Sequence, residues 1–405
     1  MVRKMHTRSS DLTITDLPAE LLHMIMLQVR RSSRVKPCSL TCRILREVAL
    51  DYLSFNGHVI VDEVPHFLTF IRNHPRIGKA VTSLSLSHST IQAKVVGDMI
   101  SLLPNLSRLS LDDARTLPPT RGDAGDSNAA SLRLLRMDVE SSGSYIPGLM
   151  HMLSSFNPQH LHLTVNPPNS KVGSFDARSL TKLPAVESLN VHTRTGTRQN
   201  VSIARVVDVL SKTLAPDTLQ LMRVTYDSKD TLRAYGSIIK RCGSKITSLT
   251  LYTDAPYPFK ERVGWVDPFD EWELLNVHAC KELQSLEIPI HVPQAKPDRA
   301  ASYVGAGILA HHAPPSLRKV VIRLHDLPRP TTLGNRSTLK LQEFDKVVTQ
   351  ARFPHLQEFE LAIGVTRDLF HKRGHWEKCV AAARRALPGL HARGVLKLTS
   401  QSWTY

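Results

Sequence analysis

The stretch "VTSLSL" (81–86) and the later stretch "LSRLSL" (106–111) share the pattern apolar-x-x-apolar-x-apolar. The alternating end of each copy places two leucines on one face of an expected strand, Leu84 with Leu86 and Leu109 with Leu111. A short strand with one apolar face cannot bury that face alone. The pattern therefore predicts a fold in which many such units stack on one another.

Further copies of the pattern continue almost to the end of the chain. They are "LRLLRM" (132–137), "VESLNV" (186–191), "LQLMRV" (219–224), "ITSLTL" (246–251), "LQSLEI" (283–288), "LRKVVI" (317–322) and "LQEFEL" (356–361), with shorter copies at 161–163 and 396–398. Their middle apolar positions are 84, 109, 135, 161, 189, 222, 249, 286, 320, 359 and 396. The early intervals are typical of leucine-rich repeats, and inserts lengthen the later ones.

Segments with helical periodicity separate the copies, for example 201–214 and 344–351. Alternating strands and helices at this short period predict an α/β fold, an irregular leucine-rich-repeat-like solenoid with a parallel sheet. The solenoid is irregular because only Asn166 occupies the position where that family usually has Asn or Cys. Segments rich in Pro, Gly, Ser and Thr predict long loops at 113–131, 165–179, 252–267 and 325–340.

Composition narrows the class of protein. The 405 residues are 41% hydrophobic, and no apolar run is long enough to cross a membrane. Five scattered cysteines argue against a disulfide framework. We therefore expect a cytoplasmic or nuclear protein with no membrane partner.

The chain is strongly basic, with 52 Lys and Arg against 36 Asp and Glu and a net charge of +16. Such an excess attracts nucleic acids or acidic proteins. However, no run of five consecutive Lys or Arg occurs, and only 6% of the residues are aromatic. These features make nucleic acid the less favoured partner.

The N-terminal segment has a different pattern from the repeats. Pro18 marks the start of an expected helix in which Leu21, Ile25 and Val29 form an apolar stripe. A second segment, 37–49, has two apolar faces, and therefore needs two surfaces to pack against. One alternative is a simple helical cap that covers the first repeat.

The other alternative comes from a resemblance. Leu17-Pro18-Ala19-Glu20-Leu21-Leu22 and Cys38-Ser39-Leu40-Thr41-Cys42-Arg43 resemble an F-box, the three-helix module that docks on the Skp-type adaptor of SCF (cullin–RING) ubiquitin ligases. Leu45 stands where that family usually has Trp or another aromatic residue, and Thr41 stands where Val is common. The following segment, 64–86, resembles the first repeat of F-box proteins from mushroom-forming (basidiomycete) fungi.

The resemblance implies three parts: a basic tail (1–14), an F-box (15–55) and the solenoid (56–405). It implies that the F-box contacts the adaptor through Leu17, Pro18, Glu20, Leu21, Leu22, Ile25, Cys38, Leu40, Cys42, Arg43 and Leu45. The implied function is substrate recognition for the ligase, with a cullin reached through the adaptor. A nucleic-acid-binding solenoid and an F-box scaffold outside a ligase remain alternatives.

Motifs for bond chemistry are missing from the sequence. It contains no phosphate-binding glycine loop, nucleophile elbow or zinc-protease helix. His371, His375 and Cys379 are spaced like metal ligands, but no fourth ligand is evident. We therefore expect no enzyme activity, no catalytic residue, no metal and no cofactor.

The open face of the sheet is the predicted substrate surface, with the loops as the alternative. The residue between the last two apolar positions of each strand faces away from the helices. The predicted substrate-binding residues on this face are Arg108, Arg136, His162, His192 and Arg223. Their basic character predicts a protein substrate with an acidic or phosphorylated segment, which Glu287, Glu358 and Glu360 would repel farther along the sheet.

Overall fold

The structure is a computed structural model, and it describes part of the chain. The described residues are 14, 17–31, 37–38, 41–52, 58–87, 90–112, 115–117, 134–141, 146–165, 175–180, 182–193, 203–226, 229–253, 272–291, 299–325, 327, 329–335, 339–365 and 374–402. Within them, no helix combines the length and hydrophobicity that a membrane-spanning segment requires.

Twelve parallel strands form one sheet, in which almost every strand pairs with the next one along the chain. In spatial order they are β1 (His58–Val61), β2 (Ser83–Ser87), β4 (Arg108–Asp112), β6 (Arg136–Ser141), β7 (His160–Val165), β8 (Ser188–Thr193), β9 (Leu221–Tyr226), β10 (Ser248–Thr253), β11 (Ser285–His291), β12 (Lys319–His325), β13 (Glu358–Val365) and β14 (Leu396–Ser402). A second, two-stranded sheet pairs β3 (Thr90–Gln92) with β5 (Arg115–Leu117).

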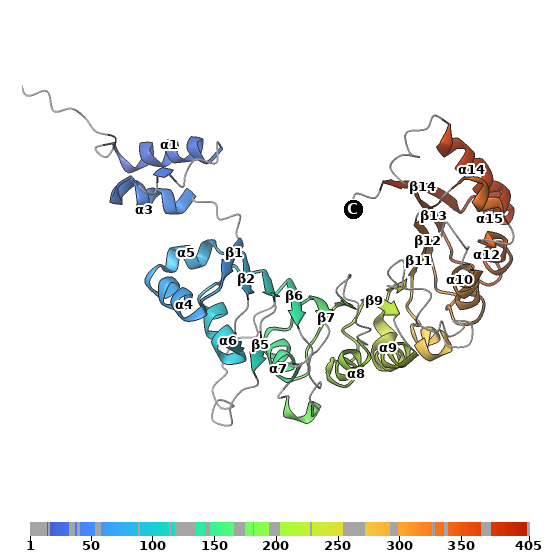
Figure 1. The fold of residues 1–405 in the computed structure, drawn as a ribbon, viewed down its shortest axis with the longest axis horizontal. Coiled ribbons are helices and arrows are strands. Elements are labelled where there is room, and N and C mark those ends of the chain that lie inside the picture. Colours follow the sequence, from blue (N-terminus) through green and yellow to red (C-terminus); the bar gives the residue numbers. More distant parts are fainter. Residues whose placement is uncertain are drawn as a thin grey trace, which may run out of the picture.

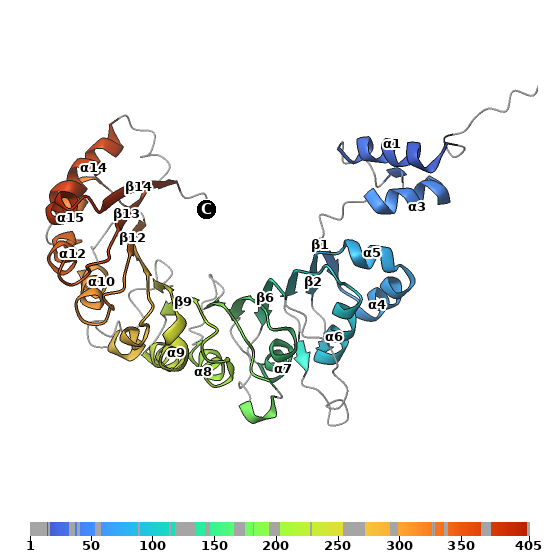
Figure 2. The same ribbon diagram turned by 180° about the vertical axis from the view of Figure 1, so that it is seen from behind.

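The helices of the solenoid lie on the outer side of an arc, and the large sheet lines its inner side (Figures 1 and 2). They are α4 (Val64–Asn73), α5 (Pro75–Ala80), α6 (Ala93–Ser101), α7 (Ile146–Phe156), α8 (Ala204–Thr213), α9 (Lys229–Cys242), α10 (Arg299–His311), α11 (Thr331–Gly334), α12 (Leu341–Val347), α14 (His375–Ala386) and α15 (Pro388–Ala392), with short 3-10 helices η2 (Ala177–Ser179), η3 (Gly243–Lys245), η6 (Trp272–Leu275) and η7 (Val277–Ala279). Two further helices, α1 (Ala19–Arg31) and α3 (Arg43–Tyr52), precede the solenoid.

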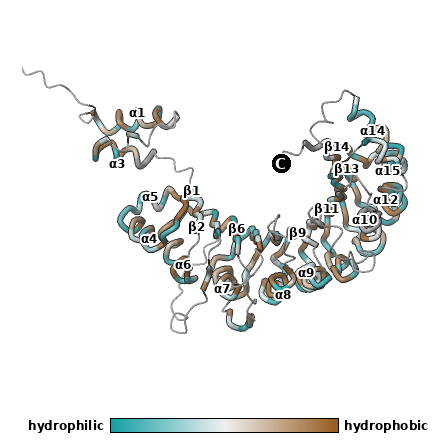
Figure 3. The backbone as a smooth tube through the Cα atoms, viewed as in Figure 1, coloured by the Kyte–Doolittle hydropathy of each residue, from teal (hydrophilic) through white to brown (hydrophobic). Residues whose placement is uncertain are grey.

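A continuous ladder of apolar side chains joins the two layers. Leu84 of β2 lies opposite Leu109, which lies opposite Met137, and the same alignment continues to Leu396 in β14. From Leu84 to Phe359 these side chains are buried against the helices. Hydrophobic and hydrophilic residues alternate along both layers (Figure 3). The predicted α/β solenoid with a parallel sheet is therefore confirmed.

Two strands of the large sheet differ from the prediction. β1 was not predicted. Its Val59 and Val61 lie opposite Leu84 and Leu86 and extend the apolar ladder by one strand. In β6 the predicted alignment on Leu135 is wrong, because Leu135 is 51% exposed and Met137 lies opposite Leu109. The segment "LRLLRMDV" fits the apolar pattern in two alignments two residues apart, and only the later one buries Val139.

Some predicted loops contain ordered structure. The segment 113–131 includes strand β5, whose Thr116 is buried. The segment 325–340 includes α11, and Leu327 and Leu333 are buried there. These inserts pack on the solenoid because each carries an apolar or hydrogen-bonding anchor.

Gly236 tests the packing of α9 against η6. A methyl group on Gly236 would lie 1.8 Å from the carbonyl oxygen of Leu274. We expect Gly236→Ala to lower the free energy of unfolding by about 2 kcal/mol or more, because backbone must move. Gly97 in α6 has no atom within 4 Å of that position, so Gly97→Ala should stabilise by about 0.5 kcal/mol. Thermal unfolding midpoints measure both changes, and equal midpoints would contradict the packing.

Candidate functional site

The inner face of the arc, formed by every second side chain of the large sheet, is polar and balanced in charge. Among its described side chains, six are cationic and six are carboxylates, namely Arg108, Arg136, Arg223, Lys319, Arg323 and Lys397 against Asp112, Asp138, Glu140, Glu287, Glu358 and Glu360. The chain's net charge of +16 therefore does not come from these strands. Histidines add to this face, among them His160, His162 and His192.

A hydrogen-bonded network begins on β6. The Nε atom of Arg136 lies 2.9 Å from both carboxylate oxygens of Asp138. On the next strand, Nδ1 of His162 lies 3.1 Å from Oδ1 of Asp138. Because an ionised carboxylate only accepts hydrogen bonds, His162 donates through Nδ1.

The network continues through a second histidine. Nε2 of His162 lies 3.0 Å from Nδ1 of His192, and Nε2 of His192 lies 3.1 Å from Oγ1 of Thr164. With Nδ1 of His162 bonded to Asp138, its Nε2 accepts a hydrogen bond from His192 when both rings are neutral. The Thr164 hydroxyl then donates to His192, so the chain runs unbroken from Thr164 to Asp138.

Burial and neighbouring charges set the protonation of this network. Burial alone would raise the pKa of Asp138, but hydrogen bonds and charges from His162 and Arg136 lower it to about 2. Burial, with the nearby charges of His162 and Arg223, lowers the pKa of His192 to about 4. At neutral pH Asp138 is therefore ionised and His192 is neutral.

The five predicted substrate-binding residues lie on the inner face, but they do not form a row of available cations. They are Arg108, Arg136, His162, His192 and Arg223. Arg136 is bound to Asp138, which the sequence analysis missed because it aligned β6 two residues too early. Aligning Met137 with Leu109 would have placed Asp138 beside His162. Arg108 and Arg223 are exposed.

The glutamates expected to repel an acidic ligand are paired with cations. Glu287 lies 2.8 Å from Nε of Arg323. Lys319 contacts Glu358 at 2.6 Å and Glu360 at 3.0 Å. These ion pairs offset the expected repulsion at the C-terminal half of the sheet.

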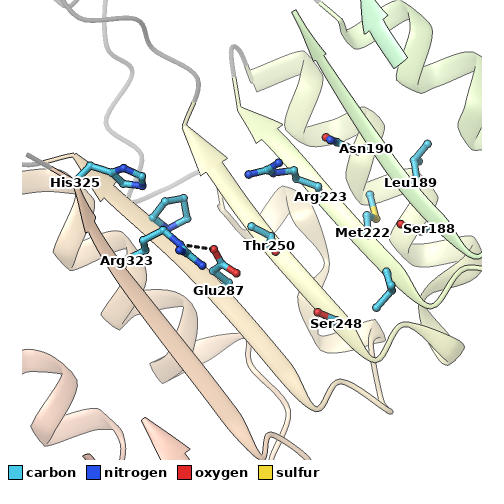
Figure 4. A pocket seen from close by; sticks show the side chains of 12 residues that line it. Ser188, Leu189, Asn190, Met222, Arg223, Ser248, Thr250, Glu287, Arg323 and His325 are labelled. Carbon is cyan, nitrogen blue, oxygen red and sulfur yellow. Dashed lines mark hydrogen bonds and ion pairs between the residues drawn. The ribbon is translucent and has the colours of Figure 1, made fainter. Parts of the chain in front are cut away.

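A hollow of about 590 Å³, the central hollow, lies over β8 to β12 (Figure 4). Its lining residues are Ser188, Leu189, Asn190, Leu221, Met222, Arg223, Ser248, Thr250, Glu287, Pro289, Arg323 and His325. The Oδ1 atom of Asn190 is buried and has no hydrogen-bond partner among the described residues.

The N-terminal helices α1 and α3 form a small unit, the helical pair, with its own core. Leu22, Met26, Leu45 and Ala49 are buried between them. Leu17, Val29, Cys38, Cys42 and Val48 are partly buried against this core. Leu22 and Leu45 therefore stabilise the pair internally, and their role in docking on an adaptor would be indirect.

Other apolar side chains of the helical pair remain exposed. Leu21, Met24 and Leu27 follow one another at spacings of three residues along α1, and their exposed fractions lie between 44% and 63%. Ile44 at the start of α3 is 49% exposed. Leu21 belongs to the stripe predicted from the sequence, whose other members Ile25 and Val29 are half-buried, whereas Met24 and Leu27 were not predicted.

The remaining predicted adaptor-binding residues lie around this surface. Pro18, Glu20 and Arg43 are exposed, and Ile25 is half-buried. Leu40 lies outside the described residues, so the third helix of the expected module is not tested.

His371, His375 and Cys379 are spaced like metal ligands near the C-terminus, and the structure describes only part of this set. His371 lies outside the described residues, and Cys379 is buried within α14. In the part of the chain that the structure describes, no three His, Cys, Asp or Glu side chains are arranged to hold a metal ion.

The chain is similar to solved structures, one of which is a leucine-rich-repeat protein. The crystal structure of the leucine-rich repeat-containing protein LegL7 from Legionella pneumophila is similar over 85% of this chain and 90% of its own, with 13% identity and a TM-score of 0.39. No family model matches the chain, and no curated protein matches its sequence. The repeated strand–helix unit of the chain itself identifies the fold as a leucine-rich-repeat-like solenoid.

His192 gives the protein a measurable pH dependence. The folded chain keeps His192 neutral down to about pH 4, whereas an unfolded histidine protonates near pH 6.5. Acidification from pH 6.5 to 4 therefore favours the unfolded chain, and this contribution to stability falls over that window. We expect the thermal midpoint of His192→Gln to fall less between pH 7 and pH 4.5 than the midpoint of the wild type does. Parallel pH profiles of the two proteins would contradict the assignment.

Proposed function

We propose that the chain is a substrate-recognition subunit of an SCF-type (cullin–RING) ubiquitin ligase. In this proposal the helical pair docks on a Skp-type adaptor, and the solenoid holds the protein to be ubiquitylated. The chain would form no bonds itself. It would act by raising the effective concentration of its substrate near the ligase.

The exposed apolar surface of the helical pair carries the proposal. Leu21, Met24 and Leu27 leave apolar area in water on a unit whose core is already filled by Leu22 and Met26. A contiguous surface of this kind marks a protein interface, because its burial by a partner is favourable. It lies in the segment that resembles an F-box, which supports a Skp-type adaptor as the partner.

The polar inner face supports protein binding rather than nucleic-acid binding. Phosphate backbones require a local excess of Lys and Arg, which release counterions on binding. The described side chains of the inner face comprise equal numbers of cations and carboxylates, and pairs such as Arg136 with Asp138 neutralise one another. The proposed substrate is therefore a protein that matches a balanced, hydrogen-bonding surface.

We expect the double variant Leu21→Asp and Leu27→Asp to lose binding to a recombinant Skp-type adaptor. Both side chains are exposed, so the helical pair should keep its fold. Burying an unpaired carboxylate in an apolar interface costs several kcal/mol, so the Kd should rise by about a hundredfold or more. Biolayer interferometry with the full-length chain and the immobilised adaptor measures this change.

Phe70→Asp is the matched control, because Phe70 is an exposed apolar residue of α4 outside the helical pair. This variant should bind the adaptor like the wild type. Adaptor binding that survives in the double variant would refute docking through this surface. Binding of adaptor without recruitment of a cullin would instead favour a scaffold outside a ligase.

A further inference from the structure

We propose that the C-terminal end of the solenoid binds an extended peptide of the substrate protein, which adds as a strand to β14 and places a carboxylate on Arg384. The inference deepens the proposed role of the solenoid in holding a substrate, and it rests on that role. It concerns a surface outside both the helical pair and the central hollow.

β14 ends the large sheet, and one of its edges has no neighbour among the described strands (Figure 1). The carbonyl of Val395, just before β14, accepts a hydrogen bond from the N–H of Phe359. Since main-chain groups alternate in direction along a strand, Leu396 and Leu398 turn their N–H and C=O groups away from β13. An edge of this kind is a template for another strand.

An apolar groove, the end groove, lies beside this edge. Its volume is about 570 Å³, and its lining residues are Trp376, Val380, Arg384, His391, Gly394, Leu396 and Leu398. Leu396 and Leu398 pack on the core of the solenoid but are only partly buried. Their register partners in β13, Phe359 and Leu361, are fully buried. An aliphatic side chain of an added strand would continue the apolar ladder by one position.

The charge of the end groove selects its occupant. Arg384 is exposed and makes no side-chain hydrogen bond or ion pair with the described residues, and no Asp or Glu lines the groove. A peptide carboxylate complements this cation. A second copy of the chain on the same edge would instead bring two sets of Arg384 and His391 together, which is unfavourable.

Strand geometry predicts the sequence of the peptide. Side chains two residues apart face the same side of a strand and lie about 7 Å from one another. One such side chain fills the apolar part of the end groove beside Trp376 and Leu398, and the next reaches Arg384. The expected motif is therefore an aliphatic residue and an Asp or Glu separated by one residue, in either order.

The experiment selects peptides from a phage-displayed random dodecapeptide library on the immobilised full-length chain, after peptides that bind Arg384→Glu have been removed. The best peptide is measured by fluorescence polarisation against wild type, Arg384→Gln and Arg385→Gln. Arg385 is the matched control, because it is the next residue of α14, is exposed and lies outside the end groove. We expect selected peptides to carry the motif. Arg384→Gln should raise the Kd about tenfold or more, and Arg385→Gln should change it by less than about twofold.

Strand addition is tested separately, through the main chain. Ser400→Pro removes an outward N–H of β14, and an edge strand tolerates proline at such a position. We expect this variant to keep the thermal midpoint of the wild type and to bind the peptide about fivefold more weakly or worse. N-methylation of alternate peptide amides should abolish binding in one of its two phases only.

Several outcomes would overturn the inference. They are the absence of any selected peptide, peptides without the motif, equal binding by Arg384→Gln and wild type, tolerance of N-methylation in both phases, or displacement of the peptide by a single-stranded oligonucleotide that binds more tightly. A wild-type dimer in light scattering that Ser400→Pro dissociates would also overturn it, because a second copy would then occupy the edge. Adaptor binding is measured on the same samples. A chain that binds the peptide but no adaptor refutes the docking proposal alone, and the reverse result refutes the end groove alone.

Discussion

The structure depends on one constraint, the alignment of an apolar pair in each strand with the same pair in the strands beside it. Leu84 and Leu86 cannot be buried by their own repeat, but Leu109 and Leu111 cover one side and the outer helices cover the other. Each fully buried leucine contributes about 2 kcal/mol, and apolar burial of this kind repeats from β2 to β13. The alignment also decides which side chains reach the inner face, because strand side chains alternate between the two sides.

The same alignment creates the functional surfaces. Parallel strands in register bring together residues that are far apart in the sequence, as Asp138, His162 and His192 show. Charges that the sequence places in separate repeats become neighbours and pair, as Glu287 and Arg323 do, and such pairs leave the inner face balanced. The helical pair obeys a different constraint, since its two helices fill their own core and leave Leu21 and Leu27 in water.

Much of the fold could be predicted from the sequence because the ladder is visible in it, from Leu84 to Phe359. The alignment of a strand was harder to predict where the apolar pattern fits the sequence in two positions. This ambiguity at Met137 is why Asp138 was not included in the predicted site. Pairing of Arg136 with Asp138, two residues along the same strand, follows from the later alignment, whereas the contacts of His162 with Asp138 and His192 depend on neighbours in space. The apolar stripes of α1 were evident, but which stripe faces α3 depends on packing, so Leu22 was assigned to docking and Met24 was missed.

The central claim is that the chain has separate docking and substrate-holding parts, and hydrogen–deuterium exchange of the full-length chain with and without a recombinant Skp-type adaptor tests it most directly. Helix amides that are covered by a partner exchange more slowly, whereas uncovered strands keep their rates. The account predicts slower exchange within residues 17–52 and unchanged exchange in β6 to β12. Unchanged exchange in 17–52 at saturating adaptor, or slower exchange in the strands alone, would contradict it.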